Sequence, residues 1–365
     1  MRQFKVAAAA LGLVIGVLAA APASAWNRGN VQVLTVLPDL INQPGVKSSV
    51  EGITVGLPPD NNIYAASSGV NAETPPTDPA NLFVIAPDGT LVRQISIGNA
   101  SPFVNGLRFN PATGALWVLD AGNGQVLNVD PTTGASSFLA DSTLFPAGTT
   151  LNALTFDAAG NGYVTDSING AIYKIPSGGG SVVTWSSDPL LKPAPPLKPD
   201  GDITPPFGAN GIEFNPPGCN PTPPCRLFVA NTANRQILEI LPDMNGNAGP
   251  ARVFINGING PDGIAIRDDR IFVCAGQEDE IVVIEAIGPT PGTVIAKLGD
   301  FDGIDGTGRV LGFLFPASLA FSNDKNTLYV SNLASPNQRA IDSAWASEVV
   351  DYTVSKLSAM LPPIP

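Results

Sequence analysis

Short apolar stretches rich in strand-forming side chains alternate with turns along most of the chain. The stretch at 151–175, LNALTFDAAGNGYVTDSINGAIYKI, is typical, because strand formers such as Leu154, Phe156 and Val164 flank a turn built on Gly and Asn. One pair of such strands cannot bury both faces of its sheet, so the pattern predicts further copies of the same unit.

Six copies of the opening strand can be aligned. They are VEGITV, VNGLRF, LNALTF, ANGIEF, PDGIAI and PASLAF, aligned on Glu51, Asn105, Asn152, Asn210, Asp262 and Ser318. The numbering puts 47 to 58 residues between successive copies, and a second apolar strand follows each one. Units of about 50 residues made almost wholly of strand are typical of propeller blades. We therefore predict an all-β fold, a six-bladed β-propeller of four-stranded antiparallel blades.

The ends of the chain carry separate signals. Residues 1–25 have Arg2 and Lys5 before an apolar run and end in Ala-Ser-Ala, which predicts a cleaved signal peptide; an uncleaved anchor is the alternative. Residues 26–365 are expected to form a single propeller domain, in which VQVLTVL near its start closes the ring against the last blade and so removes a sheet edge. The mature protein is expected to be periplasmic or secreted.

Charge and composition limit the kinds of binding partner that we expect. Loss of the leader removes two positive charges, so the formal net charge changes from −12 to −14. This balance argues against nucleic acid, which needs cationic side chains. No later stretch is apolar over the length that spans a bilayer, so no membrane association is expected after cleavage. The sequence does not determine the oligomeric state, and we expect a monomer that acts on a small-molecule substrate.

The three cysteines fit an exported protein. Cys219 and Cys225 flank the five residues NPTPP in a Pro-rich insertion, and an oxidising compartment would allow a disulfide between them. The spacing is a poor zinc signal, because there is no second pair and the chain has no His. Cys274, inside the strand RIFVCA, is expected to be buried.

Three further segments depart from the strand pattern. The Pro-rich segments at 67–81 and 189–207 are too long for turns, and they either line a binding face or form solvated extended connectors. The segment GDFDGIDGTG at 299–308 begins like a calcium loop, but Leu311 occupies the twelfth position, where an EF-hand needs Glu. We interpret it as a turn.

The aligned polar positions are the strongest candidates for a site. Without His, the chain cannot build a Ser-His-Asp triad or a His-ligated zinc site. Because the innermost strand of every blade runs beside the central channel, one residue per blade would form a ring around it. Carboxylate and amide oxygens suit Ca²⁺ or another divalent cation. The alternative is that Asn-Gly and Asp-Gly are only turn residues.

These motifs, in the order EGITV, ANGIEF, PDGIAI and RIFVCA, resemble the SMP-30/gluconolactonase family of six-bladed propellers, and GYVTDSINGAIYKI is similar to NHL-repeat propellers. The resemblance covers roughly residues 51–332. It implies a calcium-dependent hydrolase of lactones or esters, or a phosphotriesterase-type activity. Sugar-lactonase members often carry Arg where this chain has Thr150, which argues against a gluconolactone-like substrate.

The resemblance also implies roles for individual residues. Glu51, Asn152, Asn210 and Asp262 would hold the calcium ion, with Asp262 and Glu51 as the catalytic carboxylates. Asn105 is outside the family's usual ligand set, and it either faces the substrate or only packs. In this reading water or a carboxylate attacks the carbonyl with assistance from the metal. The alternative function is a non-catalytic propeller that binds a ligand or a protein, with a structural calcium ion or no metal.

Overall fold

The structure is a computed structural model that describes residues 29–69, 75–193, 206–334 and 344–361. The predicted signal peptide at 1–25 and much of the segment at 189–207 therefore lie outside the described residues. Within these ranges no helix has the length and hydrophobicity to cross a membrane.

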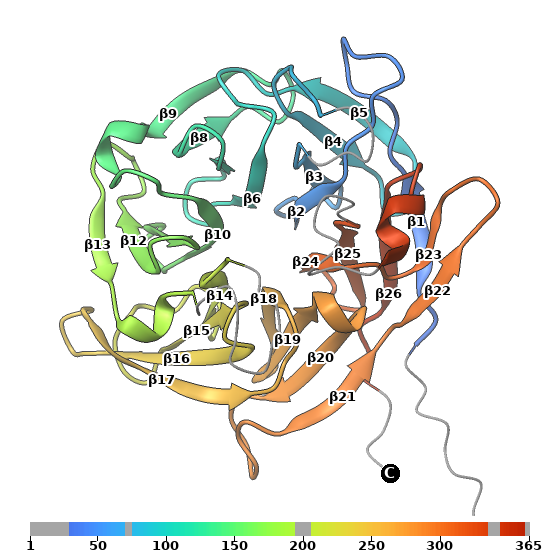
Figure 1. Cartoon of the computed structure of the whole chain (residues 1–365). Coiled ribbons are helices and arrows are strands. Elements are labelled where there is room, and N and C mark those ends of the chain that lie inside the picture. The colour runs from blue at the N-terminus through green and yellow to red at the C-terminus, as the bar shows by residue number, and fades with distance from the viewer. Residues whose placement is uncertain (1–28, 70–74, 194–205, 335–343, 362–365) are drawn as a thin grey trace, which may run out of the picture.

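Six four-stranded antiparallel sheets surround a common centre, which confirms the predicted propeller (Figure 1). In blades one to five the strands follow chain order from the innermost to the outermost. Blade one is β2 (Val50–Val55), β3 (Ile63–Ser67), β4 (Asn81–Ile85) and β5 (Leu91–Ser96); blade two is β6 (Val104–Phe109), β7 (Leu116–Asp120), β8 (Gln125–Val129) and β9 (Ser136–Ala140); blade three is β10 (Leu151–Phe156), β11 (Gly162–Asp166), β12 (Ala171–Ile175) and β13 (Val183–Ser186).

The second half of the ring repeats this order. Blade four is β14 (Ala209–Asn215), β15 (Arg226–Asn231), β16 (Gln236–Pro242) and β17 (Ala248–Asn256); blade five is β18 (Pro261–Arg267), β19 (Arg270–Ala275), β20 (Glu280–Glu285) and β21 (Val294–Leu298); blade six is β24 (Pro316–Phe321), β25 (Thr327–Asn332), β26 (Thr353–Ser358) and β1 (Gln32–Val36).

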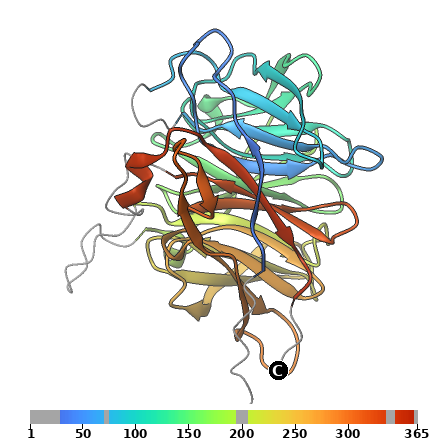
Figure 2. The same cartoon turned by 90° about the vertical axis from the view of Figure 1, so that its right-hand side faces the viewer.

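Blade six joins the two ends of the chain. Its outermost strand is β1, which pairs antiparallel with β26 from Gln32 opposite Lys356 to Val36 opposite Thr353. Figure 2 shows the N-terminal strand running alongside the C-terminal ones. The predicted closure is confirmed, and its physical effect is that β26 has no exposed edge.

The cores lie between neighbouring blades. Trp117 of blade two meets Phe156 of blade three edge to face at 5.1 Å, and Phe272 of blade five meets Phe321 of blade six at 5.0 Å. Both faces of a typical second strand are buried, as the unbroken burial of β7 shows. Each blade therefore depends on its neighbours for a core, which positions the innermost strands around the channel.

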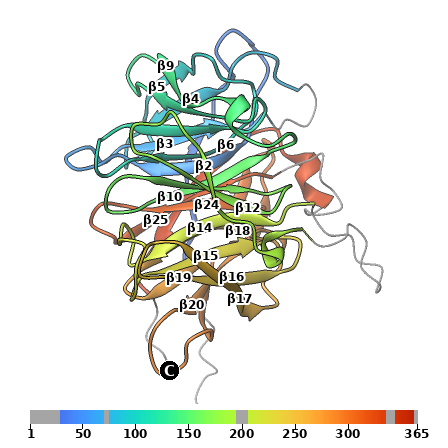
Figure 3. The same cartoon turned by 90° about the vertical axis from the view of Figure 1, so that its left-hand side faces the viewer.

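The connections between blades enter one face of the ring, where the innermost strands begin. A short 3₁₀ helix, η5 (Ala344–Glu348), lies between β25 and β26 and stands out from this face (Figures 1 and 3). The segment at 299–308, predicted to be a turn, is one only in its second half: residues 301–304 form β22 (Phe301–Ile304), and the turn at 305–308 joins it to β23 (Val310–Gly312). Three further 3₁₀ turns are η1 (Ser142–Leu144), η2 (Pro189–Leu191) and η3 (Gly276–Glu278).

The cysteines divide as expected between a bond and the core. Cys219 and Cys225 form a disulfide in the connection between β14 and β15. Cys274, in β19, is fully buried and has a free thiol.

Candidate functional site

A β-bulge interrupts the innermost strand of each blade close to its first residue. In β2, Val50 and Ile53 are paired with β3, whereas Glu51 and Gly52 between them are out of register. The innermost strands of the other five blades are interrupted at the same place. Because an extra residue bends the strand and re-aims a side chain, the bulges turn one side chain per blade toward the channel. We call these six positions the channel ring.

Close approach of neighbouring strands keeps the channel ring narrow. A Cβ added to Gly211 would lie 2.0 Å from the backbone oxygen of Asp262, and one added to Gly52 would lie 2.1 Å from that of Asn105. No side chain fits at such distances, so glycine follows the ring position wherever two innermost strands approach this closely. The Asn-Gly and Asp-Gly pairs therefore serve backbone packing as well as the ring.

Hydroxyl groups at the ends of the second strands, or directly after them, brace the bulges. Thr165 Oγ1 donates to the backbone oxygen of Asn210 at 2.7 Å. Thr232 Oγ1 donates to Pro261 O at 2.7 Å, and Ser331 Oγ donates to Glu51 O. The sequence reasoning missed these hydroxyls, although a Ser or Thr at the end of an otherwise apolar second strand was a usable signal.

Four residues of the channel ring come together at the end of the channel where the innermost strands begin, which we call the mouth. They come from four different blades and are Glu51, Asn152, Asn210 and Asp262. Burial, and secondly the charge of Asp262, raise the pKa of Glu51 well above its usual range, while a hydrogen bond from Asn152 opposes that rise. Burial raises the pKa of Asp262 to about 8, opposed by a hydrogen bond from Asn210. Blades one and three are not neighbours, so the contact between Glu51 and Asn152 spans the channel.

Two amide side chains of the channel ring have a carbonyl oxygen that lacks a hydrogen-bond partner. Asn105 Nδ2 donates to Leu151 O at 3.0 Å, and Asn210 Nδ2 donates to Thr232 Oγ1 at 2.9 Å. Both Oδ1 atoms are buried and accept no hydrogen bond from the described residues. A buried polar atom left unpaired costs roughly 1–3 kcal/mol. The NH₂ groups thus hold both amides in place and leave two acceptors available to a ligand.

These donors fit a hard divalent cation. In addition to desolvation, the charge of Asp262 raises the pKa of Glu51, and a cation between the two carboxylates would remove that repulsion. The unpaired amide oxygen of Asn210 is a neutral ligand of the type that Ca²⁺ accepts. Within the described ranges no cluster of three or more Asp, Glu or Cys side chains forms a metal site, so the charge available here comes from Glu51 and Asp262.

The alignment on Ser318 is wrong by one residue, because Ala317 holds the ring position of blade six. The bulge of β24 falls between Pro316 and Ser318. Ser318 N donates to Ser331 Oγ, the bond that Ala153 N makes to Thr165 Oγ1 in blade three. Ser318 therefore corresponds to the residue after the ring position. The channel ring has five side chains with oxygen and one methyl group.

Both described ends of the 189–207 segment lie at the same mouth. Asn231 Nδ2, at the end of β15, donates to the backbone oxygens of Leu190 and Lys192 at 2.7 and 2.9 Å. At the other end, Gly208 N donates to Ser167 O at 2.7 Å. The connection between β13 and β14 thus leaves from and returns to the face that carries Asn210.

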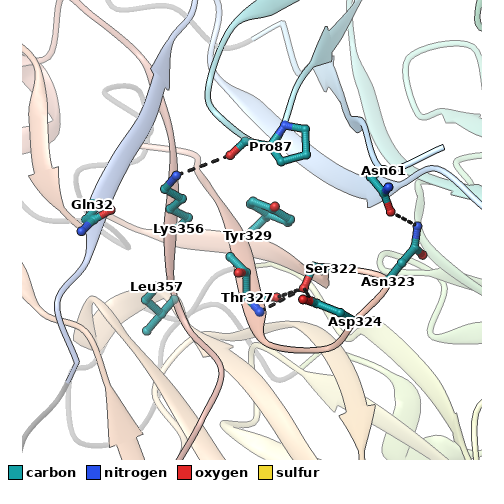
Figure 4. A pocket seen from close by; sticks show the side chains of 10 residues that line it. All are labelled: Gln32, Asn61, Pro87, Ser322, Asn323, Asp324, Thr327, Tyr329, Lys356 and Leu357. Atoms are coloured by element: carbon teal, nitrogen blue, oxygen red, sulfur yellow. Dashed lines mark hydrogen bonds between the residues drawn. The ribbon is translucent and has the colours of Figure 1, made fainter. Parts of the chain in front are cut away.

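A cleft of about 520 Å³ lies on the opposite face, at the seam between blades six and one (Figure 4). Its lining includes Asn61 and Asn323, which belong to turns at the far ends of the innermost strands, and Lys356 of β26. Asn323 Nδ2 donates to Asn61 Oδ1 at 2.9 Å across the seam. Because none of the ring residues reaches this cleft, its volume does not mark the candidate site.

No family model matches the chain, and no curated protein matches it in sequence. Solved structures match across most of its length. A gluconolactonase from Xanthomonas campestris is 15% identical over 91% of this chain and 89% of its own, with a TM-score of 0.58. A luciferin-regenerating enzyme is 14% identical over 88% of this chain and 95% of its own, with a TM-score of 0.58.

A third structure is regucalcin from Agrobacterium tumefaciens, described as a calcium-binding protein. It is 16% identical over 88% of this chain and 94% of its own, with a TM-score of 0.56. At such identities the likeness establishes the fold. The chain thus shares the six-bladed architecture of the gluconolactonase and regucalcin propellers, as the motifs in its sequence predict.

Proposed function

We propose that the protein is an exported hydrolase that cleaves a lactone or ester with the help of a divalent cation, Ca²⁺ being the expected one. The observation that carries the proposal is the convergence of the carboxylates of Glu51 and Asp262 with two amide oxygens that have no hydrogen-bond partner at one mouth of the channel. The likeness in fold to a gluconolactonase and to a calcium-binding regucalcin supports it.

Glu51, Asn152, Asn210 and Asp262 would hold the cation. When bound, it would supply Lewis-acid polarisation of a substrate carbonyl. The carboxylates must lose their protons before they bind it. Because burial raises the pKa of Asp262 to about 8, the affinity for the cation should rise with pH up to that value.

The chain's own groups account for the remaining steps. Asp262, once deprotonated, is the base that takes a proton from the attacking water, and the same proton can pass to the alkoxide that leaves. Thr232, which accepts from Asn210 and donates to Pro261 O, holds two neighbouring ring positions in register. Asn105 Oδ1 is a fixed acceptor on the opposite side, suited to a hydroxyl or water of the substrate complex.

The test pairs calcium titration calorimetry with a panel of lactones and aryl esters, on wild type and Asp262→Ala. One bound ion and hydrolysis, both lost in the variant, are the expected result. Binding without hydrolysis of any panel member would favour the non-catalytic alternative, in which the cation ties blades together. No binding would refute the metal site. Mass spectrometry of the exported protein tests the leader, with Trp26 expected as the first residue.

A further inference from the structure

Blade six differs from the other blades around the mouth in three positions. Its ring position is Ala317, whereas the other five blades present a carboxylate or an amide. Two more positions can be compared blade by blade, because a backbone bond joins them. The residue after the second strand donates to the residue before the innermost strand, as Leu333 N does to Phe315 O at 3.0 Å.

In the other blades these two positions hold mostly small or hydroxylated residues. The pairs joined by this bond are Ser68 with Ser49, Ser167 with Thr150, Thr232 with Gly208, and Gly276 with Gly260. In blade two the donor is one residue further along, Gly122, and the acceptor is Phe103. Blade two thus shares a Phe at the first of these positions, but only blade six combines Phe315, Ala317 and Leu333 at all three.

The three side chains form a small apolar cluster of their own, separate from the cores between blades. Phe315 and Leu333 are 3% and 5% exposed, which matches the 2–6% exposure of Asn210 and Asp262 in the channel ring. The third member, Ala317, is fully buried, so Phe315 and Leu333 carry the exposed apolar surface of this cluster.

Phe315 lies beside the carboxylate end of the site. Its ring atoms come within 3.0–3.2 Å of where a Cβ on Gly276 would stand, so the ring covers that glycine of blade five. Gly276 follows Ala275, which pairs with Pro261, the neighbour of Asp262. The aromatic ring therefore lies beside the part of the mouth between Asp262 on blade five and Glu51 on blade one. We call this part, with Phe315, Ala317 and Leu333, the apolar sector.

The backbone is strained to hold this arrangement. Phe315 has a φ of 45°, in the left-handed region that a bulky side chain seldom adopts. Asp279 Oδ1 accepts from Phe315 N at 2.8 Å and helps to keep it there. A strained backbone conformation of this kind persists where the surrounding contacts hold it in place, and it is often found at functional sites.

We infer that blade six is the apolar side of the mouth and seats the alkyl part of the substrate, so that the preferred lactones or esters carry an aliphatic substituent. This inference rests on the hydrolase function proposed above. A polyhydroxylated ring placed here would bury hydroxyls against Phe315, Ala317 and Leu333 without hydrogen-bond partners, whereas an alkyl chain gains from burial there.

The experiment uses γ-lactones with unbranched alkyl substituents of increasing length, from γ-butyrolactone to γ-decalactone, on the calcium-supplemented protein. In wild type we expect kcat/KM to rise roughly fourfold for each added methylene until the sector is filled, since each buried CH₂ is worth about 0.8 kcal/mol. A kcat/KM independent of chain length would overturn the inference.

Three variants locate the effect. Phe315→Gly removes the ring at a φ that glycine adopts freely, and Leu333→Thr installs the residue that blade four has at this position. Both should flatten the dependence of kcat/KM on chain length. Phe103→Gly, the matched change on blade two, should keep the full dependence. A dependence that survives in both blade-six variants would refute the assignment, and thermal unfolding identifies any variant that fails to fold.

A binding experiment separates this inference from the proposed function. If no lactone is hydrolysed, the hydrolase proposal fails, and calorimetric titration with butanoate, hexanoate, octanoate and decanoate still tests the apolar sector. Affinity that rises with chain length and falls in Phe315→Gly supports it. Affinity that ignores chain length refutes it.

Discussion

Substitution of Asp262 by Asn should change how the stability of the metal-free protein depends on pH. Asn occupies the ring position in three other blades, at Asn105, Asn152 and Asn210, so the bulge accepts it without rearrangement. The variant therefore removes one titrating group and preserves the backbone that holds it.

The sign of the effect follows from the direction of the shift. Burial raises the pKa of Asp262 from 3.8 to about 8, so between these values the native carboxyl binds its proton more tightly than the unfolded one. The metal-free native state then holds more protons, and wild type loses stability as the pH rises from about 4 to about 8. About four pKa units at 1.36 kcal/mol each set an upper limit on the order of 5 kcal/mol.

Urea unfolding in EDTA at pH 4 to 9 measures this loss. We expect Asp262→Asn to match wild type near pH 4 and to exceed it by a few kcal/mol near pH 9. Asp243→Asn, at an exposed turn, is the control and should retain the wild-type fall. The reasoning is refuted if wild-type stability does not fall with pH, or if Asp262→Asn falls as steeply.

Calcium should reverse the effect in wild type alone. At pH 8 a free concentration 100 times the dissociation constant stabilises the native state by about 2.7 kcal/mol. Asp262→Asn keeps the ring oxygens and loses one of two charges, so its stabilisation at the same concentration should be much smaller. Equal stabilisation of both proteins would place the ion elsewhere.

Three further changes test the architecture. Gly211→Ala would put a Cβ 2.0 Å from the backbone oxygen of Asp262, so it should lower the free energy of unfolding by at least about 2 kcal/mol and weaken calcium binding. The control Gly178→Ala, whose Cβ would meet no atom within 4 Å, should change that free energy by no more than about 0.5 kcal/mol. Equal urea midpoints for the two variants would contradict this. Glu213→Gln removes the buried charge that Arg108 pairs with across blades two and four and should cost roughly 1–3 kcal/mol, which unchanged unfolding would disprove. Deletion of residues 26–37 removes β1 and exposes the edge of β26, so we expect aggregation by light scattering; a soluble, cooperatively unfolding monomer would show that closure is dispensable.

Most of the fold was predictable because strand signals are local. Alternating apolar and turn residues determine each strand pair, and their recurrence predicted the blades. The closing strand was predictable too, because the last blade needs an outer strand and VQVLTVL near the start of the mature chain can supply it.

The candidate site was only partly predictable. Glu51, Asn152, Asn210 and Asp262 share a position in the repeat, and the structure brings them together. Blade six was misaligned because PASLAF has Ala317 where the other copies have a polar residue, and its Ser318 stands where most copies have Gly. Only the pairing of β24 with β25 shows which residue is bulged. The bracing hydroxyls were missed because each acts on the next blade.

The sequence by itself determined the number of blades, the order of their strands and the type of oxygen donor that five of the six blades contribute. These properties follow from side-chain pattern and turn chemistry within about 50 residues. The tertiary structure decided which donors meet across the channel, how burial raises their pKa values, and that blade six presents an apolar side. Those outcomes depend on the bulge register and on contacts between blades that are far apart in the chain, which no local pattern encodes.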